Sequence, residues 1–259
     1  MGLYTMGVNL MGATPNFEYV FSNVRFMLLI TTPILTMRIL SEERRQKTDQ
    51  LLFSAPVSTL SIVLGKFFAA AAVFALPLLL CACYPLILSL YGTVSYPTVY
   101  GAMFGFLFLG VALIAIGVFL SSITENPVIA AIGCFGLLMF CYLVPSITDA
   151  LSSSTTASLA AFAVISVLLG LWIYYMTKNP IIGGIVGVAG LVLLVVLYNA
   201  DQYVFSGAFT QVLNTLAVFS YLDPFISGVF DLNSLVYYLS VTVLFLFFTV
   251  QAVEKRRWS

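Results

Sequence analysis

The sequence predicts an all-α membrane protein, a polytopic bundle of transmembrane helices. Of its 259 residues, 61% are hydrophobic and only 8% are charged, whereas a soluble domain is typically about 45–50% apolar and about 25% charged. No charged residue occurs from Phe67 to Thr124, a run long enough for two spans because one helix needs roughly 20 apolar residues. The apolar runs are continuous, which argues against the short alternating segments of transmembrane β-strands.

Seven apolar segments are long enough to span a membrane. They lie at residues 20–40, 62–91, 97–123, 127–147, 157–177, 181–200 and 232–253. Asn126–Pro127 and Asn179–Pro180 each suit a helix start, since proline is favoured in the first turn. Residues 1–13 are apolar but too short to span, so we interpret them as the outer end of a truncated first span. We therefore expect seven full spans plus this stub, in a single domain of residues 1–259.

The basic residues indicate the orientation, because cytoplasmic loops are enriched in Lys and Arg. With residues 38–49 in the cytoplasm, alternate threading leaves only Arg25, among ten Lys and Arg residues, on the outer side. The cytoplasmic segments are then 41–61, 121–127, 177–180 and a tail from residue 254. The outer loops contain the acidic residues Glu18, Asp149, Asp201, Asp223 and Asp231.

The longest outer segment, 201–231, predicts an amphipathic helix lying at the outer membrane surface. Its apolar residues recur at helical spacing, with polar residues among them. They are Phe205, Phe209, Val212, Leu213 and Leu216, with Gln211, Asn214 and Thr215 between. A hydrophobic loop is the alternative interpretation.

Several classes of function lack the residues that they need. The spans contain essentially no ionisable side chain, which argues against proton-coupled transport and intramembrane proteolysis. The chain has no histidine, which excludes a His-based metal site. Gly65–Lys66 is not a P-loop, because that pattern needs Gly five residues earlier and Ser or Thr next, where Leu60 and Phe67 stand. We expect no catalytic or metal-binding residue, so any energy for transport must come from another subunit.

One stretch, residues 38–52 (RILSEERRQKTDQLL), differs from the rest of the chain. It carries seven of the twenty charged side chains: Arg38, Glu42, Glu43, Arg44, Arg45, Lys47 and Asp49. Ser41 can cap a helix with Glu42 and Glu43 in its first turn, where carboxylates favour the helix dipole. With Leu51–Leu52 behind it, this predicts a short amphipathic element along the inner membrane face. A solvated loop is the alternative interpretation. Keeping a loop on the cytoplasmic side needs only Lys and Arg, so the mixture of acidic and basic residues favours a contact surface.

Residues 33–70 resemble the permease subunit of type-2, export-class ABC transporters. That family shows a span ending in a basic residue, paired Glu, a basic cluster, Thr-x-x-Leu-Leu, Pro-[Val/Ile]-Ser and Gly-Lys. The corresponding residues are Arg38, Glu42–Glu43, Arg44–Arg45, Thr48, Leu51–Leu52, Pro56–Val57–Ser58 and Gly65–Lys66. Lys47 stands where the family usually has Gly, a departure that we expect to alter the helix break.

Residues 219–259 are similar to the gliding-motility-type branch of that family. In that branch Phe-x-x-Gly-x-x-Asp precedes a last span that ends in Glu, basic residues and Trp. The corresponding residues are Phe225, Gly228, Asp231 and Glu254–Lys255–Arg256–Arg257–Trp258. The family often has six spans, so the predicted hairpin around 157–200 is an addition.

The resemblance implies a permease that forms half of an export pathway in a bacterial inner membrane. Segment 41–61 would be the coupling segment for a separate cytoplasmic ABC ATPase, which would bind ATP and Mg, so this chain would hold no cofactor. The ATPase-coupling residues would be Glu42, Glu43, Arg44, Arg45 and Thr48 facing the ATPase, with Leu51 and Leu52 against membrane or bundle. The structural-motif residues would be Pro56, Gly65, Lys66, Gly228 and Asp231. A second permease copy or homologue would complete the pathway, and no nucleic acid is expected as a partner.

Two other classes of function remain open: a non-transporting scaffold or channel subunit, and a membrane-embedded transferase. A transferase would need carboxylates at a membrane face, and Asp149, Asp201, Asp223 and Asp231 could supply them. No basic or histidine partner accompanies these residues in the sequence. The lack of charge in the spans suits lipids, peptides or amphipathic drugs as substrates.

Overall fold

The computed structural model describes residues 2, 7, 18–48, 57–90, 93–150 and 208–257. All regular structure in these ranges is helical, and no strand occurs in them. The elements are α2 (Glu18–Val24), η2 (Arg25–Met27), α3 (Leu28–Thr36), α4 (Ser41–Arg45), α6 (Thr59–Cys81), α7 (Tyr84–Leu88), α8 (Tyr96–Ile123), α9 (Pro127–Ala150), α12 (Ala208–Leu216), η4 (Ser220–Leu222), α13 (Asp223–Ile226) and α14 (Leu232–Arg257). The predicted all-α class is confirmed.

Five helical stretches in the described part of the chain are long and apolar enough to cross a membrane. They are Val20–Arg45, Thr59–Leu88, Tyr96–Ile123, Pro127–Asp149 and Leu232–Arg256, and each corresponds to one predicted span. The predicted spans 157–177 and 181–200, and most of residues 1–13, lie outside the described residues. The total of seven spans plus a stub therefore stays a prediction.

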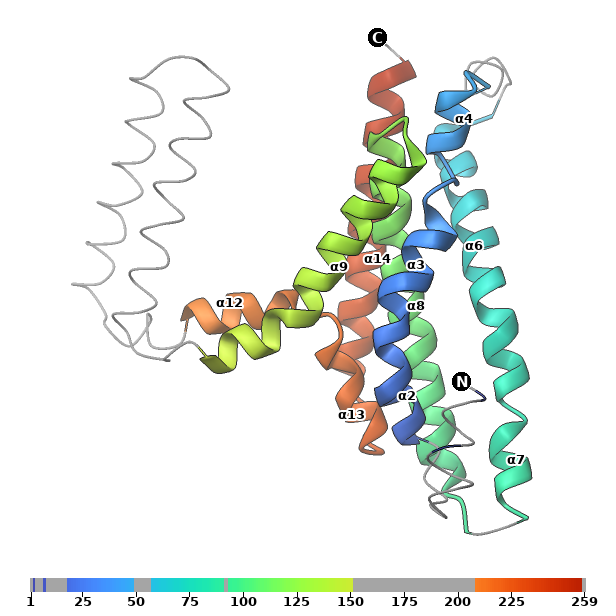
Figure 1. Ribbon diagram of the computed structural model, residues 1–259, viewed down its shortest axis with the longest axis vertical. Coiled ribbons are helices and arrows are strands. Elements are labelled where there is room, and N and C mark those ends of the chain that lie inside the picture. The colour runs from blue at the N-terminus through green and yellow to red at the C-terminus, as the bar shows by residue number, and fades with distance from the viewer. Residues whose placement is uncertain are drawn as a thin grey trace, which may run out of the picture. The chain divides into compact units, whose positions relative to one another are not determined.

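The chain divides into two compact units, one comprising Met1–Cys141 with Val218–Ser259, the other Tyr142–Ala217. In the first unit α8 is the central helix, with α14, α3 and α6 packed against it (Figure 1). In α8, 67% of an 18-residue apolar stretch is buried, against 22% of such a stretch in the α6–α7 span and 28% in α14. A helix that is apolar on all sides is stable when it is surrounded. The continuous apolar sequence of α8 therefore fits its central place.

Three glycines of α8 allow side chains of neighbouring elements to approach its backbone. The pairs are Gly105 with Phe225, Gly110 with Phe74, and Gly117 with Thr36. A Cβ on Gly105 would lie 2.6 Å from the Phe225 ring, whereas one on Gly101 would meet nothing within 4 Å. Gly105 therefore serves packing within the chain, as small residues do between membrane helices.

Proline and asparagine mark several helix boundaries. α9 begins at Pro127, and the Asn126 Oδ1 atom accepts a hydrogen bond of 2.9 Å from the Val128 amide, as the Asn–Pro signal predicts. Proline also lies inside α6, at Pro77, and α7 resumes the same span with Pro85 in its first turn.

The second unit contains the end of α9 and α12. α12 falls within the predicted outer segment 201–231, and its sequence is amphipathic. On it, Val212 is 53% exposed and Leu216 is 45% exposed. A helix is therefore present in this segment, and its position at the outer membrane surface stays a prediction.

Candidate functional site

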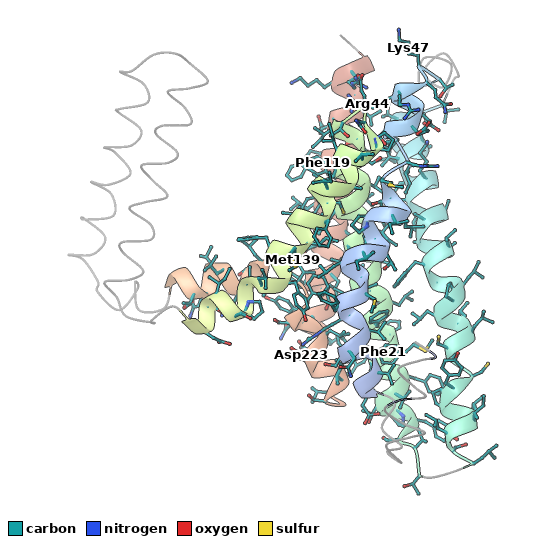
Figure 2. The ribbon with its side chains drawn as sticks, viewed as in Figure 1. Phe21, Arg44, Lys47, Phe119, Met139 and Asp223 are labelled. Carbon is teal, nitrogen blue, oxygen red and sulfur yellow. The ribbon has the colours of Figure 1, made fainter. Side chains whose placement is uncertain are left out.

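Three segments that are far apart in the sequence meet at one end of the first unit, which we call the charged end. They are α4, the turn of residues 124–126 between α8 and α9, and the last turn of α14. Figure 2 shows Arg44 and Lys47 at this end, and Phe21 and Asp223 toward the opposite end. The three meeting segments belong to the ranges that alternate threading assigns to one side of the membrane.

Buried Ser121 of α8 fixes the start of α4. Its hydroxyl accepts hydrogen bonds of 3.1 Å from the backbone amides of Leu40 and Ser41, and it donates one of 3.1 Å to the Met37 carbonyl. The prediction that Ser41 caps α4 is wrong, because Ser41 lies inside the helix, is fully buried and donates its hydroxyl to Met37. A side chain from another helix satisfies the free amides that a local cap would otherwise bind.

Glu43 and Lys66 join α4 to α6. The Lys66 Nζ atom forms an ion pair with the Glu43 carboxylate and donates a hydrogen bond of 2.8 Å to the Ile39 carbonyl. The Lys66 side chain is 21% exposed and that of Glu43 is 36% exposed. The lysine of the Gly-Lys motif thus holds both α4 and the backbone that precedes it.

Arg44 points toward the bundle, and its side chain is only 11% exposed. Its Nη1 atom donates to the Ser122 carbonyl, and its Nη2 atom lies 4.0 Å from the Glu125 carboxylate. The same carboxylate oxygen is 2.5 Å from the Arg256 guanidinium near the end of α14. Glu125 therefore lies between the charges of α4 and α14.

Most of the remaining side chains of residues 42–48 are exposed. Arg45, Gln46, Lys47 and Thr48 are exposed, and Glu42 is half-buried. Glu42 accepts a hydrogen bond of 2.8 Å from Gln46, one helical turn along. The structure thus divides the patch into anchoring residues and an outward surface formed by its second half.

α4 ends at Arg45 and is followed by Lys47, whose φ of +57° is in the left-handed region. The Lys47 amide donates to the Arg44 carbonyl at 3.2 Å and the Thr48 amide to the Glu43 carbonyl at 3.0 Å. This pair of bonds is a Schellman motif, in which the left-handed residue is usually glycine. The helix break is therefore present although the sequence has lysine there.

Phe225, Gly228 and Asp231 have separate structural roles at the opposite end. Phe225 is 1% exposed and lies against Gly105, and Gly228 ends α13 with a φ of +81°. The Asp231 carboxylate accepts bonds from the Asn233 amide at 3.1 Å and the Ser234 amide at 3.2 Å, and so caps α14. The motif anchors one short helix, ends it and starts the last span.

Asp223, also at this end, has a basic partner. Its carboxylate is 2.6 Å from the Arg25 guanidinium. The prediction that no basic residue accompanies the outer carboxylates is therefore wrong for Asp223. The two residues are 198 positions apart, so sequence proximity could not reveal the pair.

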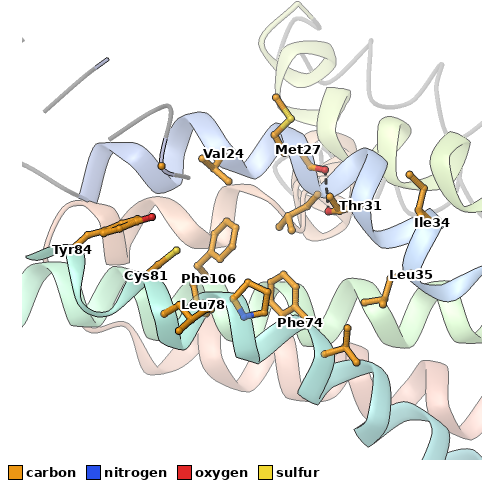
Figure 3. Close-up of a pocket in the computed structure, with 15 residues that line it drawn as sticks. Val24, Met27, Thr31, Ile34, Leu35, Phe74, Leu78, Cys81, Tyr84 and Phe106 are labelled. Carbon is orange, nitrogen blue, oxygen red and sulfur yellow. Dashed lines mark hydrogen bonds between the residues drawn. The ribbon is translucent and has the colours of Figure 1, made fainter. Parts of the chain in front are cut away.

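A cavity of about 670 Å³ lies in the first unit between α2–α3 and α6–α7 (Figure 3). Val24, Leu35 and Leu78 belong to its apolar lining, and Phe74 and Phe106 stack there with ring centroids 6.0 Å apart. The Thr31 hydroxyl, which also lines it, donates to the Met27 carbonyl at 3.0 Å. The volume is within the range typical of small-molecule sites, about 300–1,000 Å³, and the lining suits an apolar ligand.

The sequence-predicted site residues are only partly brought together. Leu51, Leu52 and Pro56 lie outside the described residues. A Cβ on Gly65 would meet nothing within 4 Å, so packing gives no reason for that glycine. Sequence reasoning missed Ser121 and Glu125. The sequence could have drawn attention to Glu125, because it is the one charged residue from 67 to 148.

Comparison with protein families gives a match over the first part of the chain. A family model described as ABC-2 family transporter protein matches residues 5–163, which is more than half of the chain. Comparisons with curated proteins and with solved structures give no match. The matched range includes α4 and Glu125. This multi-pass membrane chain therefore belongs to the ABC-2 family of transporter proteins and is a permease subunit of an ABC transporter.

Proposed function

We propose that the chain forms half of an export pathway and is driven by a separate cytoplasmic ATPase that contacts α4. The observation that carries the proposal is the division of the charged patch. Glu43 and Arg44 are held by the bundle, whereas Arg45, Lys47 and Thr48 are exposed at the end of α4. A partner that grips the exposed residues would move an element that is bonded to the bundle.

The contacts of α4 suggest how such a movement would reach the spans. Ser121 bonds the start of α4 to α8, and Lys66 bonds it to α6. α4 also follows α3 along the chain, with four residues between Thr36 and Ser41. A displaced α4 would therefore act on three spans, because packed helices move as rigid bodies.

The ATP and Mg²⁺ would belong to the partner, and a second copy of this chain or a homologue would supply the other half of the pathway. The C-terminal motif resembles that of the gliding-motility-type branch. This resemblance supports a bacterial inner membrane as the location of the chain. The apolar cavity between α3 and α6 supports a substrate with a substantial apolar part, such as a lipid, a peptide or an amphipathic drug.

The transferase alternative loses support from the outer carboxylates. Asp223 is paired with Arg25, and Asp231 caps α14. Each of these two residues therefore has a structural role that accounts for its charge.

Charge reversal on the exposed part of α4 tests the proposal. The chain is co-expressed with candidate ABC ATPases from its own genome, and complex recovery and ATP hydrolysis are measured after purification. Arg45→Glu is expected to abolish most of the recovered complex. An ATPase surface that accepts the basic Arg45 would repel a carboxylate at the same position. Lys255→Glu is the matched control, since Lys255 is exposed on α14 at the same end.

Equal recovery of the ATPase with Arg45→Glu, Lys255→Glu and the unchanged chain would contradict the docking role of α4. An equal loss with both variants would also contradict it, because the effect would then depend on overall charge rather than on α4.

A further inference from the structure

We propose that Glu125 is a positioning residue that joins the docking helix α4 to the last span, α14. This inference rests on the proposed function, because it concerns how a movement of α4 reaches the bundle. The joint consists of Arg44 on α4, Glu125 in the turn after α8, and Arg256 on α14.

The turn that carries Glu125 is held on both sides. The Thr124 hydroxyl donates to the Asn126 carbonyl at 3.1 Å, and Asn126 caps α9. The carbonyl of nearby Ser122 accepts from Arg44. Glu125 therefore projects its carboxylate from a short turn that is tied to α8, α9 and α4.

The charges around this carboxylate are arranged for bridging. Arg256 contacts it at 2.5 Å and Arg44 at 4.0 Å, so one negative charge faces two positive charges from different elements. Arg44 is also the more deeply buried, at 11% exposure against 34% for Arg256. Removing Glu125 would leave two like charges facing each other at the charged end, and these repel.

The Glu125 side chain itself is 63% exposed. An exposed ion pair contributes little to stability, so thermal unfolding is a poor test of its importance. Its effect is expected in the relative position of α4 and α14, where an exposed pair favours one arrangement by about fivefold at most.

The arrangement is measured directly on the full chain, without a partner. Spin labels are placed on Arg45→Cys and Gln251→Cys, both exposed positions, in a Cys83→Ala background because Cys81, Cys134 and Cys141 are buried. Electron-electron distance distributions are recorded in lipid nanodiscs for Glu125→Arg, Arg256→Glu and the double variant. Each single variant is expected to broaden the distribution. The double variant restores opposite charges between α14 and the turn, although Arg44 still faces a positive charge, and is expected to narrow the distribution in part.

Lys255→Glu is the matched control and is expected to keep the narrow distribution. The same four substitutions, made in a chain that keeps Arg45 and Gln251, are then assayed with the ATPase. The single variants are expected to keep ATPase recovery but to lose stimulation of ATP hydrolysis, with partial rescue in the double variant. Unchanged distances in the single variants, or no rescue by the double variant, overturn the inference. Failure of the proposed function is distinguishable, because it removes ATPase recovery from the unchanged chain and leaves the distances unaffected.

Discussion

Lys47 has a backbone conformation that disfavours any residue with a Cβ atom. Its φ is +57°, and left-handed geometry costs an ordinary residue roughly 1–2 kcal/mol. Lys47→Gly is therefore expected to raise the free energy of unfolding by about 1 kcal/mol after allowance for the greater freedom of unfolded glycine. Thermal unfolding of the detergent-solubilised chain measures the change.

Lys47→Ala is the control for this substitution, because it removes the same charge and keeps the Cβ atom. It is expected to unfold near the temperature of the unchanged chain. If alanine stabilised the chain as much as glycine, the effect would come from the lost charge and the conformational argument would be wrong.

At the level of single residues, the sequence was most informative where the cause is local. Lys47 in place of the usual glycine of the family motif led us to expect an altered helix break, but the break is present, because Lys47 itself adopts the left-handed turn that follows α4. The sequence could not show that Glu43 and Arg44 turn inward. Their partners Lys66 and Glu125 come from other spans, and only the packing of those spans decides which charges meet.

At the level of elements, the cap of α14 carries a pH dependence. The hydroxyl of Ser234, followed by the backbone amides of Asn233 and Ser234, holds the pKa of Asp231 below its ordinary value of 3.8. A lowered pKa in the folded state means that the ionised carboxylate stabilises the fold above pH 3.8. This contribution is lost as the pH falls through the lowered pKa.

Asp231→Asn removes the charge and one of the two acceptor oxygens. At neutral pH the variant is expected to unfold at a lower temperature than the unchanged chain, and this difference is expected to shrink as the pH falls below 3.8. Melting temperatures from about pH 7 to about pH 3 measure it. The other carboxylates are common to both proteins, so a difference that stayed constant over this range would exclude the carboxylate charge as its cause.

The spans themselves followed from hydrophobic length, and the boundaries at Pro127 and near Ile123 agree with the sequence because turn chemistry is local. The position of the break at Ala82–Cys83 between α6 and α7 was not predicted, although Pro85, which follows it, favours a kink in this span. The exact neighbours of α8 were not predictable either. Any apolar helix can pack on another, and the choice depends on details such as the fit of Phe225 against Gly105.

Across the whole first unit, charge is separated between two ends. The charged end contains α4, Glu125 and the end of α14, whereas the opposite end contains the Arg25–Asp223 pair. Arg25 is the one basic residue that threading places outside, and Asp223 neutralises it at 2.6 Å. The exception to the positive-inside pattern therefore has a structural compensation.

This separation predicts which positions face each side of the membrane. In a Cys83→Ala background, a membrane-impermeant maleimide is expected to label Arg45→Cys and Lys255→Cys only from the cytoplasmic side, and Ser227→Cys only from the outer side. All three positions are exposed, so reactivity reports the side rather than burial. Labelling of intact cells and of inside-out vesicles measures this, with detergent-solubilised protein as the control for intrinsic reactivity.

Arg45→Cys and Lys255→Cys must behave alike, because Arg44 and Arg256, their neighbours, contact the same carboxylate. Labelling of these two from opposite sides would contradict the packing of the unit, whereas labelling of all three from one side would contradict the spanning of the membrane by α14.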